Sequence, residues 1–182
     1  STIYDPGYFS LPGDSHRFRD WKRGGHGTVD LKKSIQMPVD TYYYKLAYEM
    51  GIQRLHDWMV RFGFGDKTGI DLPNEKSGIM PSPKWKKDTY DKDWLPGETI
   101  SVSIGQGYFL ATPLQIANAT AMTASKGKHI TPHLLKSSDG AAEVKVITKP
   151  DGKIEYNGQP SDWLRMHAAM ESVVENGTGR GI

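Results

Sequence analysis

The chain has 182 residues, and its 23 Lys and Arg against 21 Asp and Glu give a formal net charge of +2. Because the charges are so evenly balanced and form no long basic run, the chain is not expected to bind nucleic acid. The absence of cysteine excludes disulfides and thiol chemistry. No apolar run reaches the roughly 18 residues of a membrane helix. This composition is typical of one globular domain or of part of a larger one.

The first third of the chain is predicted to be a loop region followed by helices. Residues 1–27 are rich in glycine and proline, which predicts an ordered loop region. From there on, apolar residues recur at helical spacing. Residues 28–62 are therefore predicted to form a helical subdomain of three short helices, which end near Pro38, Gly51 and Gly63.

The rest of the chain mixes loops, helices and strands. Residues 63–98 are predicted to be mostly loop, with one or two helical turns near 81–88. In residues 99–182 we expect helices and sheet strands. Apolar residues alternate in 99–107, which predicts a strand, whereas 112–127 has the pattern of a capped helix.

The C-terminal part continues this mixture. Two strands are predicted at 130–137 and 142–149, and a second strong helix at 161–177. Helix outnumbers strand, and the strands fall late in the chain. This is an α+β pattern whose sheet is incomplete.

One tripeptide has the letters of a catalytic motif. Lys67-Thr68-Gly69 matches the Lys-Thr-Gly that penicillin-reactive serine enzymes carry on a strand beside the active site. Here glycines and Pro73 bracket the tripeptide, so a loop is predicted instead of a strand.

The serine nucleophile of that chemistry requires Ser-x-x-Lys, which occurs only as Ser125-Lys126-Gly127-Lys128. This run lies at the C-terminal end of a predicted helix, whereas an oxyanion needs the N–H groups of a helix N-terminus. No Ser-x-Asn occurs. Taken residue by residue, the sequence contains no complete catalytic set.

The loop region contains hard metal ligands. Asp5, Asp20 and His26 could converge there on a metal ion. The alternative is that all three are solvated loop residues, and the residues alone leave both interpretations open.

Several segments, in the same order, resemble the transpeptidase domain of class B penicillin-binding proteins, and most closely its members in the rod-shape elongation machinery. The matching segments are 4–13, 19–27, 40–65, 68–81 and 103–121. In segment 103–121, the runs Ser-Ile-Gly-Gln-Gly and Thr-Pro-Leu-Gln are highly specific to this family.

This resemblance implies an α/β (α+β) fold, the penicillin-binding, serine β-lactamase-like transpeptidase fold. The chain is expected to be a single partial domain over 1–182, supplying mostly the helical subdomain and part of the antiparallel sheet. The implied function is that of a D,D-transpeptidase, which cross-links peptidoglycan stem peptides by serine acyl transfer and binds β-lactams. Its Ser-x-x-Lys is expected before residue 1 and its Lys-(Ser/Thr)-Gly after residue 182, so the chain alone is expected to be inactive.

The resemblance places the family's middle motif, Ser-x-Asn or Ser-x-Asp, at Pro38, Val39 and Asp40. Asp40 matches the motif and is the expected catalytic remnant, whereas Pro38 has neither the hydroxyl nor a backbone N–H. Either the chain was altered here or its parent works without that hydroxyl.

No cofactor is required by this family, but zinc is a possible ligand. Some members are thought to hold zinc beside the middle motif through two Asp, one His and one Cys. The resemblance puts Asp5, Asp20 and His26 at three of these positions and Val39 at the cysteine. Three ligands bind zinc less well than four.

The resemblance also implies partners and a location: stem peptides, β-lactams, a membrane glycosyltransferase and other elongation proteins, at the periplasmic face of the bacterial inner membrane. One alternative is a non-catalytic binding or scaffold module with the same fold, which Pro38 favours. A β-lactamase or penicillin sensor is a second alternative.

Overall fold

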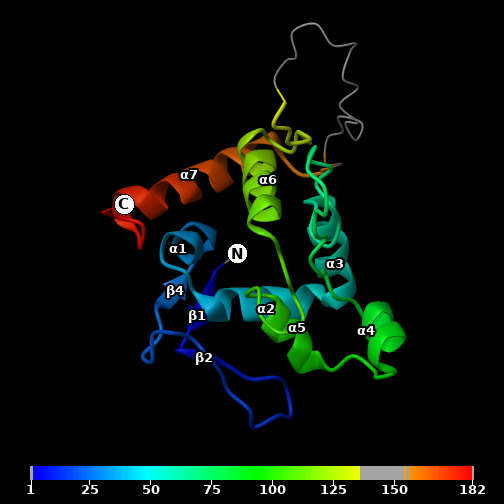
Figure 1. Cartoon of the computed structure of the whole chain (residues 1–182). Coiled ribbons are helices and arrows are strands. Elements are labelled where there is room, and N and C mark those ends of the chain that lie inside the picture. Colours follow the sequence, from blue (N-terminus) through cyan, green and yellow to red (C-terminus); the bar gives the residue numbers. More distant parts are fainter. Residues whose placement is uncertain (1, 136–153, 155, 182) are drawn as a thin grey trace, which may run out of the picture. The chain divides into compact units, whose positions relative to one another are not determined.

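The computed structural model describes residues 2–135, 154 and 156–181. The strands within them are β1 (Ile3–Asp5), β2 (Tyr8–Phe9), β3 (Phe18–Arg19) and β4 (Gly27–Val29). The helices are α1 (Leu31–Gln36), α2 (Asp40–Met50), α3 (Ile52–Arg61), α4 (Pro83–Tyr90), α5 (Pro96–Val102), α6 (Pro113–Ala124) and α7 (Pro160–Asn176) (Figure 1).

The chain forms two compact units. The first consists of Ser1–His56, Pro81–Tyr108 and Gly158–Ile182, and the second of Asp57–Met80 and Phe109–Asn157. No helix within the described residues is long and apolar enough to cross a membrane.

Two small antiparallel sheets organise the start of the first unit. Strand β1 pairs with β4, which sets Asp5 opposite Gly27, and β2 pairs with β3, which sets Tyr8 opposite Arg19. The region expected to be an ordered loop thus contains two strand pairs. Because each strand has only two or three residues, neither pair gave a readable alternation in the sequence.

Helices α1 and α2 meet at a sharp break. Asp30 caps α1, its carboxylate accepting from the Lys33 N–H at 2.8 Å. Met37 is extended, at φ −124° and ψ 98°, as a residue before proline prefers to be. The proline therefore ends α1, as predicted, and α2 begins two residues later.

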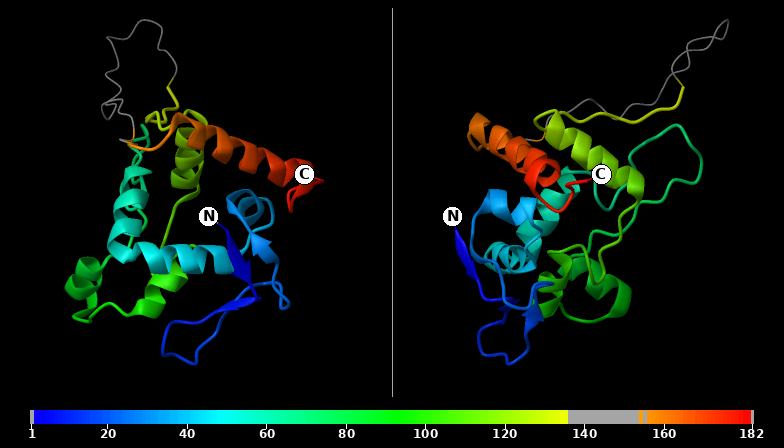
Figure 2. Two further views of the ribbon diagram at one scale, coloured as in Figure 1. Left: turned by 180° about the vertical axis from the view of Figure 1, so that it is seen from behind. Right: turned by 90° about the vertical axis from the view of Figure 1, so that its left-hand side faces the viewer.

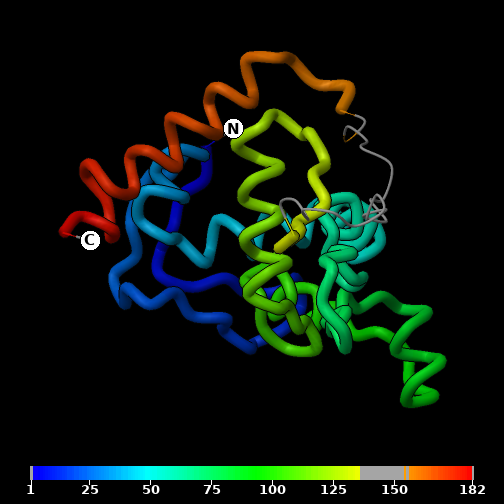
Figure 3. Tube along the Cα trace, turned by 45° about the horizontal axis from the view of Figure 1, so that its top comes forward, coloured from blue at the N-terminus to red at the C-terminus, as the bar shows by residue number. Residues whose placement is uncertain are grey.

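The first unit has its core where this helix pair meets the β1–β4 sheet. Val29, Val39 and Tyr42 are buried there, and Ile3 and Leu31 pack against them. Helix α7 lies alongside α1 (Figure 3), and α2 packs against α5 (Figure 2). The three helices predicted within residues 28–62 are present as α1, α2 and α3.

One predicted strand is wrong, since residues 96–102 form helix α5. Pro96 occupies its first turn, and the Glu98 carboxylate accepts from the Leu95 N–H at 2.7 Å. The buried Ile100 and Val102 alternate, but a short apolar run fits a helix as well as a strand. The proline and the capping carboxylate decide in favour of the helix.

In the second unit, helix α6 begins as the sequence predicts. Thr112 caps it and Pro113 follows. Gln115 is 1% exposed, and its side-chain amide donates to the carbonyls of Asp66 and Ser77, both at 2.7 Å. One glutamine thus anchors the loop between α3 and α4 to α6.

The strand predicted at 130–137 is wrong as far as residue 135, where the described chain has no strand. The strand predicted at 142–149 lies outside the described residues. The predicted helix at 161–177 is confirmed as α7, which begins at Pro160.

Candidate functional site

The candidate site begins with a buried carboxylate at the end of β1. The register of β1 and β4 places Asp5 opposite Gly27 and so beside His26. The Asp5 carboxylate accepts from the His26 N–H at 2.8 Å, from His26 Nδ1 at 2.7 Å and from the Gly7 N–H at 2.7 Å. A buried carboxylate therefore has three donors, which is what removing it from water requires.

Asp20 joins this pair from the end of β3. The β2–β3 pairing brings it close, and its N–H donates to the Gly7 carbonyl at 2.9 Å. Its carboxylate lies 3.6 Å from His26 Nδ1 and accepts from the Thr41 N–H at 3.2 Å. Asp20 thus ties the loop to the first turn of α2.

Two glycines let the backbone close around the cluster. Gly25 has φ +70°, and a Cβ there would lie 2.2 Å from the Asp5 carbonyl oxygen. Gly7 has φ +91°, and its Cβ would lie 2.5 Å from the Arg23 carbonyl oxygen. Any side chain at either position would push β1 away from the loop that carries Asp20 and His26.

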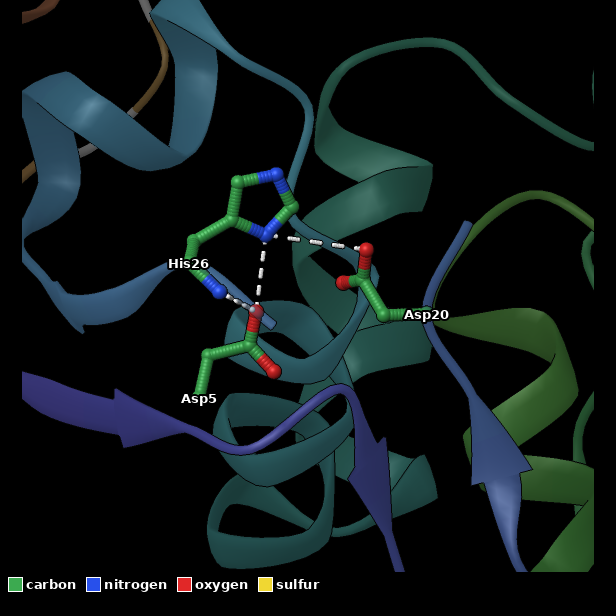
Figure 4. A group of neighbouring side chains, drawn as sticks. All are labelled: Asp5, Asp20 and His26. Atoms are coloured by element: carbon green, nitrogen blue, oxygen red, sulfur yellow. Dashed lines mark hydrogen bonds and ion pairs between the residues drawn. The ribbon is translucent and has the colours of Figure 1, made fainter. Parts of the chain in front are cut away.

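The structure brings Asp5, Asp20 and His26 together, as the metal hypothesis requires. One ligand atom from each lies within 4.8 Å of the others, and all three residues are buried. In Figure 4 the imidazole Nδ1 faces both carboxylates. Burial raises the pKa of Asp5, but the hydrogen bonds from Gly7 and His26 outweigh it and hold the pKa below its ordinary value. Asp5 is therefore ionised at neutral pH.

The cluster fits three positions of a zinc site but not the fourth. Two carboxylates and an imidazole are suitable donors, and the Nδ1–carboxylate contact of 2.7 Å is that of a hydrogen bond. Val39, which the resemblance places at the cysteine, is fully buried and has no ligating atom. The donors present thus form a hydrogen-bonded group in which His26 Nε2 is buried without a partner, and they do not complete a four-ligand structural site.

Residues 38–40, which the resemblance places at the middle motif, lie directly before and at the start of α2. Asp40 is the first residue of the helix. The Pro38 carbonyl accepts a hydrogen bond of 2.6 Å from the Trp21 indole. Trp21 was not among the predicted site residues, although a tryptophan between charged residues in a glycine-rich loop is the kind of feature that marks a functional loop.

The environment of Asp40 favours its neutral form more than water does. Burial raises its pKa, the negative charge of Asp20 raises it further, and a hydrogen bond from the Trp21 backbone opposes both. Burial also raises the pKa of Tyr44 to about 12, with the charges of Asp40 and Asp20 adding to the effect. Tyr44 therefore stays protonated beside two acids.

The Lys-Thr-Gly lookalike has a structural role, as predicted. Residues 67–69 are not in a strand. Thr68 donates from its hydroxyl at 2.6 Å and from its N–H at 2.7 Å to one Glu75 oxygen, and the Gly69 N–H donates to the other. The threonine hydroxyl is buried in the loop and unavailable to a substrate.

The Ser-x-x-Lys lookalike is structural as well. Ser125 lies at the C-terminal end of α6, where its hydroxyl donates to the carbonyls of Met122 and Lys128. It therefore faces carbonyl acceptors at the C-terminal end of a helix, whereas an oxyanion is stabilised by the N–H groups of a helix N-terminus.

Comparison with known proteins points to one family. The family model for the penicillin binding protein transpeptidase domain matches residues 2–182. The peptidoglycan D,D-transpeptidase MrdA of Acinetobacter baumannii is 57% identical over 182 residues, which cover 100% of this chain and 27% of that protein. MrdA of Haemophilus influenzae is 46% identical and covers 99% and 28%. The chain thus spans little more than a quarter of these relatives.

Solved structures agree with the sequence matches. PBP2 of Pseudomonas aeruginosa, in complex with WCK 5153, has a TM-score of 0.89 at 45% identity over 99% of this chain and 39% of its own. PBP2 of Helicobacter pylori, in a complex with MreC, has a TM-score of 0.86 at 37% identity over 99% and 32%.

The buried cluster yields a stability prediction. Replacing Asp5 with Asn presents an amide N–H₂ to donors that need an acceptor, so we expect a loss of about 3–5 kcal/mol in the free energy of unfolding. Chemical denaturation measures this loss. The matched control is Asp14→Asn, since Asp14 is exposed and its carboxylate accepts from the nearby His16 N–H. Equal stability of the two variants would contradict the role given to Asp5.

Proposed function

We propose a function from one premise: the chain belongs to the penicillin-binding protein transpeptidase domain family. It has the penicillin-binding transpeptidase fold. We propose that it is part of a peptidoglycan D,D-transpeptidase, which cross-links stem peptides during cell-wall growth and is acylated by β-lactams. The observation that carries this proposal is the 57% identity, over the whole chain, to a protein of that name.

The proposed reaction is acyl transfer. A serine of the longer protein attacks the D-Ala-D-Ala carbonyl, a lysine takes its proton, and backbone N–H groups hold the oxyanion. In the family's motif order, that Ser-x-x-Lys precedes residue 1 and the functional Lys-(Ser/Thr)-Gly follows residue 182. The serine mechanism is therefore a proposal for the whole protein, and the chain alone is proposed to be inactive.

This chain contributes the middle motif. The contacts from Asp20 to Thr41 and from Trp21 to Pro38 hold residues 38–40 in one geometry, which supports a positioning role for them. Asp40 is the proposed catalytic remnant. Pro38 offers no hydroxyl, so the proton relay that a serine would provide there is missing.

Partners and location follow from the same family. We propose that the longer protein acts at the periplasmic face of the inner membrane on peptidoglycan stem peptides. We further propose contacts with a membrane glycosyltransferase and other elongation proteins. The Helicobacter pylori complex of PBP2 with MreC supports the second proposal, as does a relative found in a peptidoglycan synthase complex.

Labelling with a fluorescent penicillin tests this function. We expect the full-length protein to form a covalent adduct that survives denaturing electrophoresis, because its serine is acylated. We expect no adduct on the 182-residue chain. An unlabelled but folded full-length protein would favour the scaffold module instead, which Pro38 supports.

Restoring the missing hydroxyl should speed the reaction. In the full-length protein, Pro38→Ser is expected to raise the acylation rate constant about tenfold or more, since a positioned proton-transfer group contributes on that scale. Pro38→Ala is the matched control, because it restores the backbone N–H but not the hydroxyl. Equal acylation rate constants for Pro38→Ser and Pro38→Ala would contradict a role for the hydroxyl.

We also propose that Asp5, Asp20 and His26 hold zinc as a three-ligand site of reduced affinity. The support is their convergence within 4.8 Å. The ion would cross-link β1 to the loop that carries Asp20 and His26, a structural role outside the reaction itself.

A cysteine at the fourth position should tighten that site. We expect Val39→Cys to bind zinc about tenfold or more tightly than the wild-type full-length protein, as measured by competition with a chromogenic chelator. Val29→Cys is the matched control, since Val29 is an equally buried valine of the same core. Zinc affinities that do not differ between these variants would count against the site.

A further inference from the structure

The end of α7 packs against the end of α1, close to the middle motif (Figures 1 and 3). Both helices bury small side chains: Ser34 on α1, and Ala169 and Ser172 on α7, each at most 1% exposed. Where the turn after α7 meets the end of α1, the contact is between backbone atoms, since the Thr178 N–H donates to the Gln36 carbonyl.

Gly177 lies at the tightest point of this contact. A Cβ on Gly177 would lie 2.2 Å from the Gln36 carbonyl oxygen, a distance that real Cβ atoms do not reach. Its φ of −105° is ordinary, so the glycine is required by close approach and not by backbone conformation. A Cβ there would also lie 2.8 Å from the Val173 Cα and carbonyl oxygen, so a side chain has to separate the turn from both Gln36 and the last turn of α7, with the closest clash at Gln36.

A hydrogen bond adds to the close approach. The Thr178 N–H donates to the same Gln36 carbonyl at 3.2 Å. The turn that presents it is fixed on its other side, because the N–H groups of Gly177 and Gly179 both donate to the Val173 carbonyl, at 3.1 and 3.0 Å. The 177–179 turn is thus rigidly attached to α7 and bonded to the last residue of α1.

Gln36 is two residues before Pro38, so this contact bears on the middle motif. The segment that contains residues 38–40 has two sets of contacts. In the first, the Val39 N–H donates to the Ser34 carbonyl at 3.3 Å, and the 177–179 turn bonds to Gln36. In the second, the Trp21 indole donates to the Pro38 carbonyl.

We propose that the 177–179 turn is a positioning element for the middle motif, with Gly177 as its positioning residue. This inference rests on the proposed function, which puts the Lys-(Ser/Thr)-Gly motif downstream of the same turn. The turn would then be linked by sequence to one catalytic motif and, through its contact with Gln36, to the segment that carries the other. A change at Gly177 would alter the geometry of the reaction more than the binding of the substrate.

The test is Gly177→Ala in the full-length protein. Its reaction with a fluorescent penicillin is resolved into two quantities: the dissociation constant of the non-covalent complex and the acylation rate constant. We expect the rate constant to fall about tenfold or more, because small displacements of positioned groups cost that much. The dissociation constant is expected to stay within about threefold.

Two glycines serve as controls. Gly24 has open space around it and an ordinary φ, so Gly24→Ala is expected to leave both constants unchanged. In Gly179→Ala, the new Cβ meets Val173 at 3.2 Å and does not meet Gln36. It disturbs the turn without pushing α1, so we expect a change of less than about twofold.

The outcomes are distinct. A wild-type rate constant in Gly177→Ala, or an equal fall in Gly179→Ala, overturns the inference. An unlabelled wild type overturns the proposed function instead.

If Gly177→Ala does not fold, hydrogen exchange of the wild-type protein decides. On acylation, segments 36–41 and 177–180 should change protection together, and a change in only one of them overturns the inference.

Discussion

The first unit depends on the satisfaction of one buried negative charge. Asp5 is fully buried, and a carboxylate in that position is tolerated only when donors surround it. Those donors come from Gly7 and His26, so β1 has to lie beside β4 and the loop between them has to fold back. The glycines at 7 and 25 make this closure possible. Once the loop has closed, the Asp20 carboxylate can accept the hydrogen bond from the Thr41 N–H in the first turn of α2.

This constraint extends to the proposed reaction. The loop that closes over Asp5 also carries Trp21, which holds the Pro38 carbonyl, and Asp20, which holds the Thr41 N–H. The 177–179 turn supports the same segment from α1. Contacts from distant parts of the sequence therefore hold the segment that we propose as the middle motif, even though Pro38 lacks the hydroxyl of the serine that the resemblance implies there.

Local features of the fold could be predicted from the sequence, because they depend on neighbouring residues. Thr112 and Pro113 mark a helix start by capping rules, and they lie where those rules put them. The strand predicted at 99–107 was wrong because alternation in a short run does not distinguish strand from helix. The candidate site could be predicted from the sequence only in part. Asp5, Asp20 and His26 could be named as candidate ligands, but the residues alone left open whether they converge. The contacts of Trp21 and Gly177 depend on tertiary packing, so the sequence did not predict them.

We propose that the loop carrying Asp20 and Trp21 sets the geometry of the middle motif. Replacing Trp21 with Phe tests it most directly, because Trp21 is 58% exposed and the change removes the indole N–H while leaving an aromatic ring. The measurement is the penicillin acylation rate constant of the full-length variant. The account predicts a fall of about fivefold, the equivalent of one hydrogen bond, without loss of thermal stability. An unchanged rate constant would contradict it.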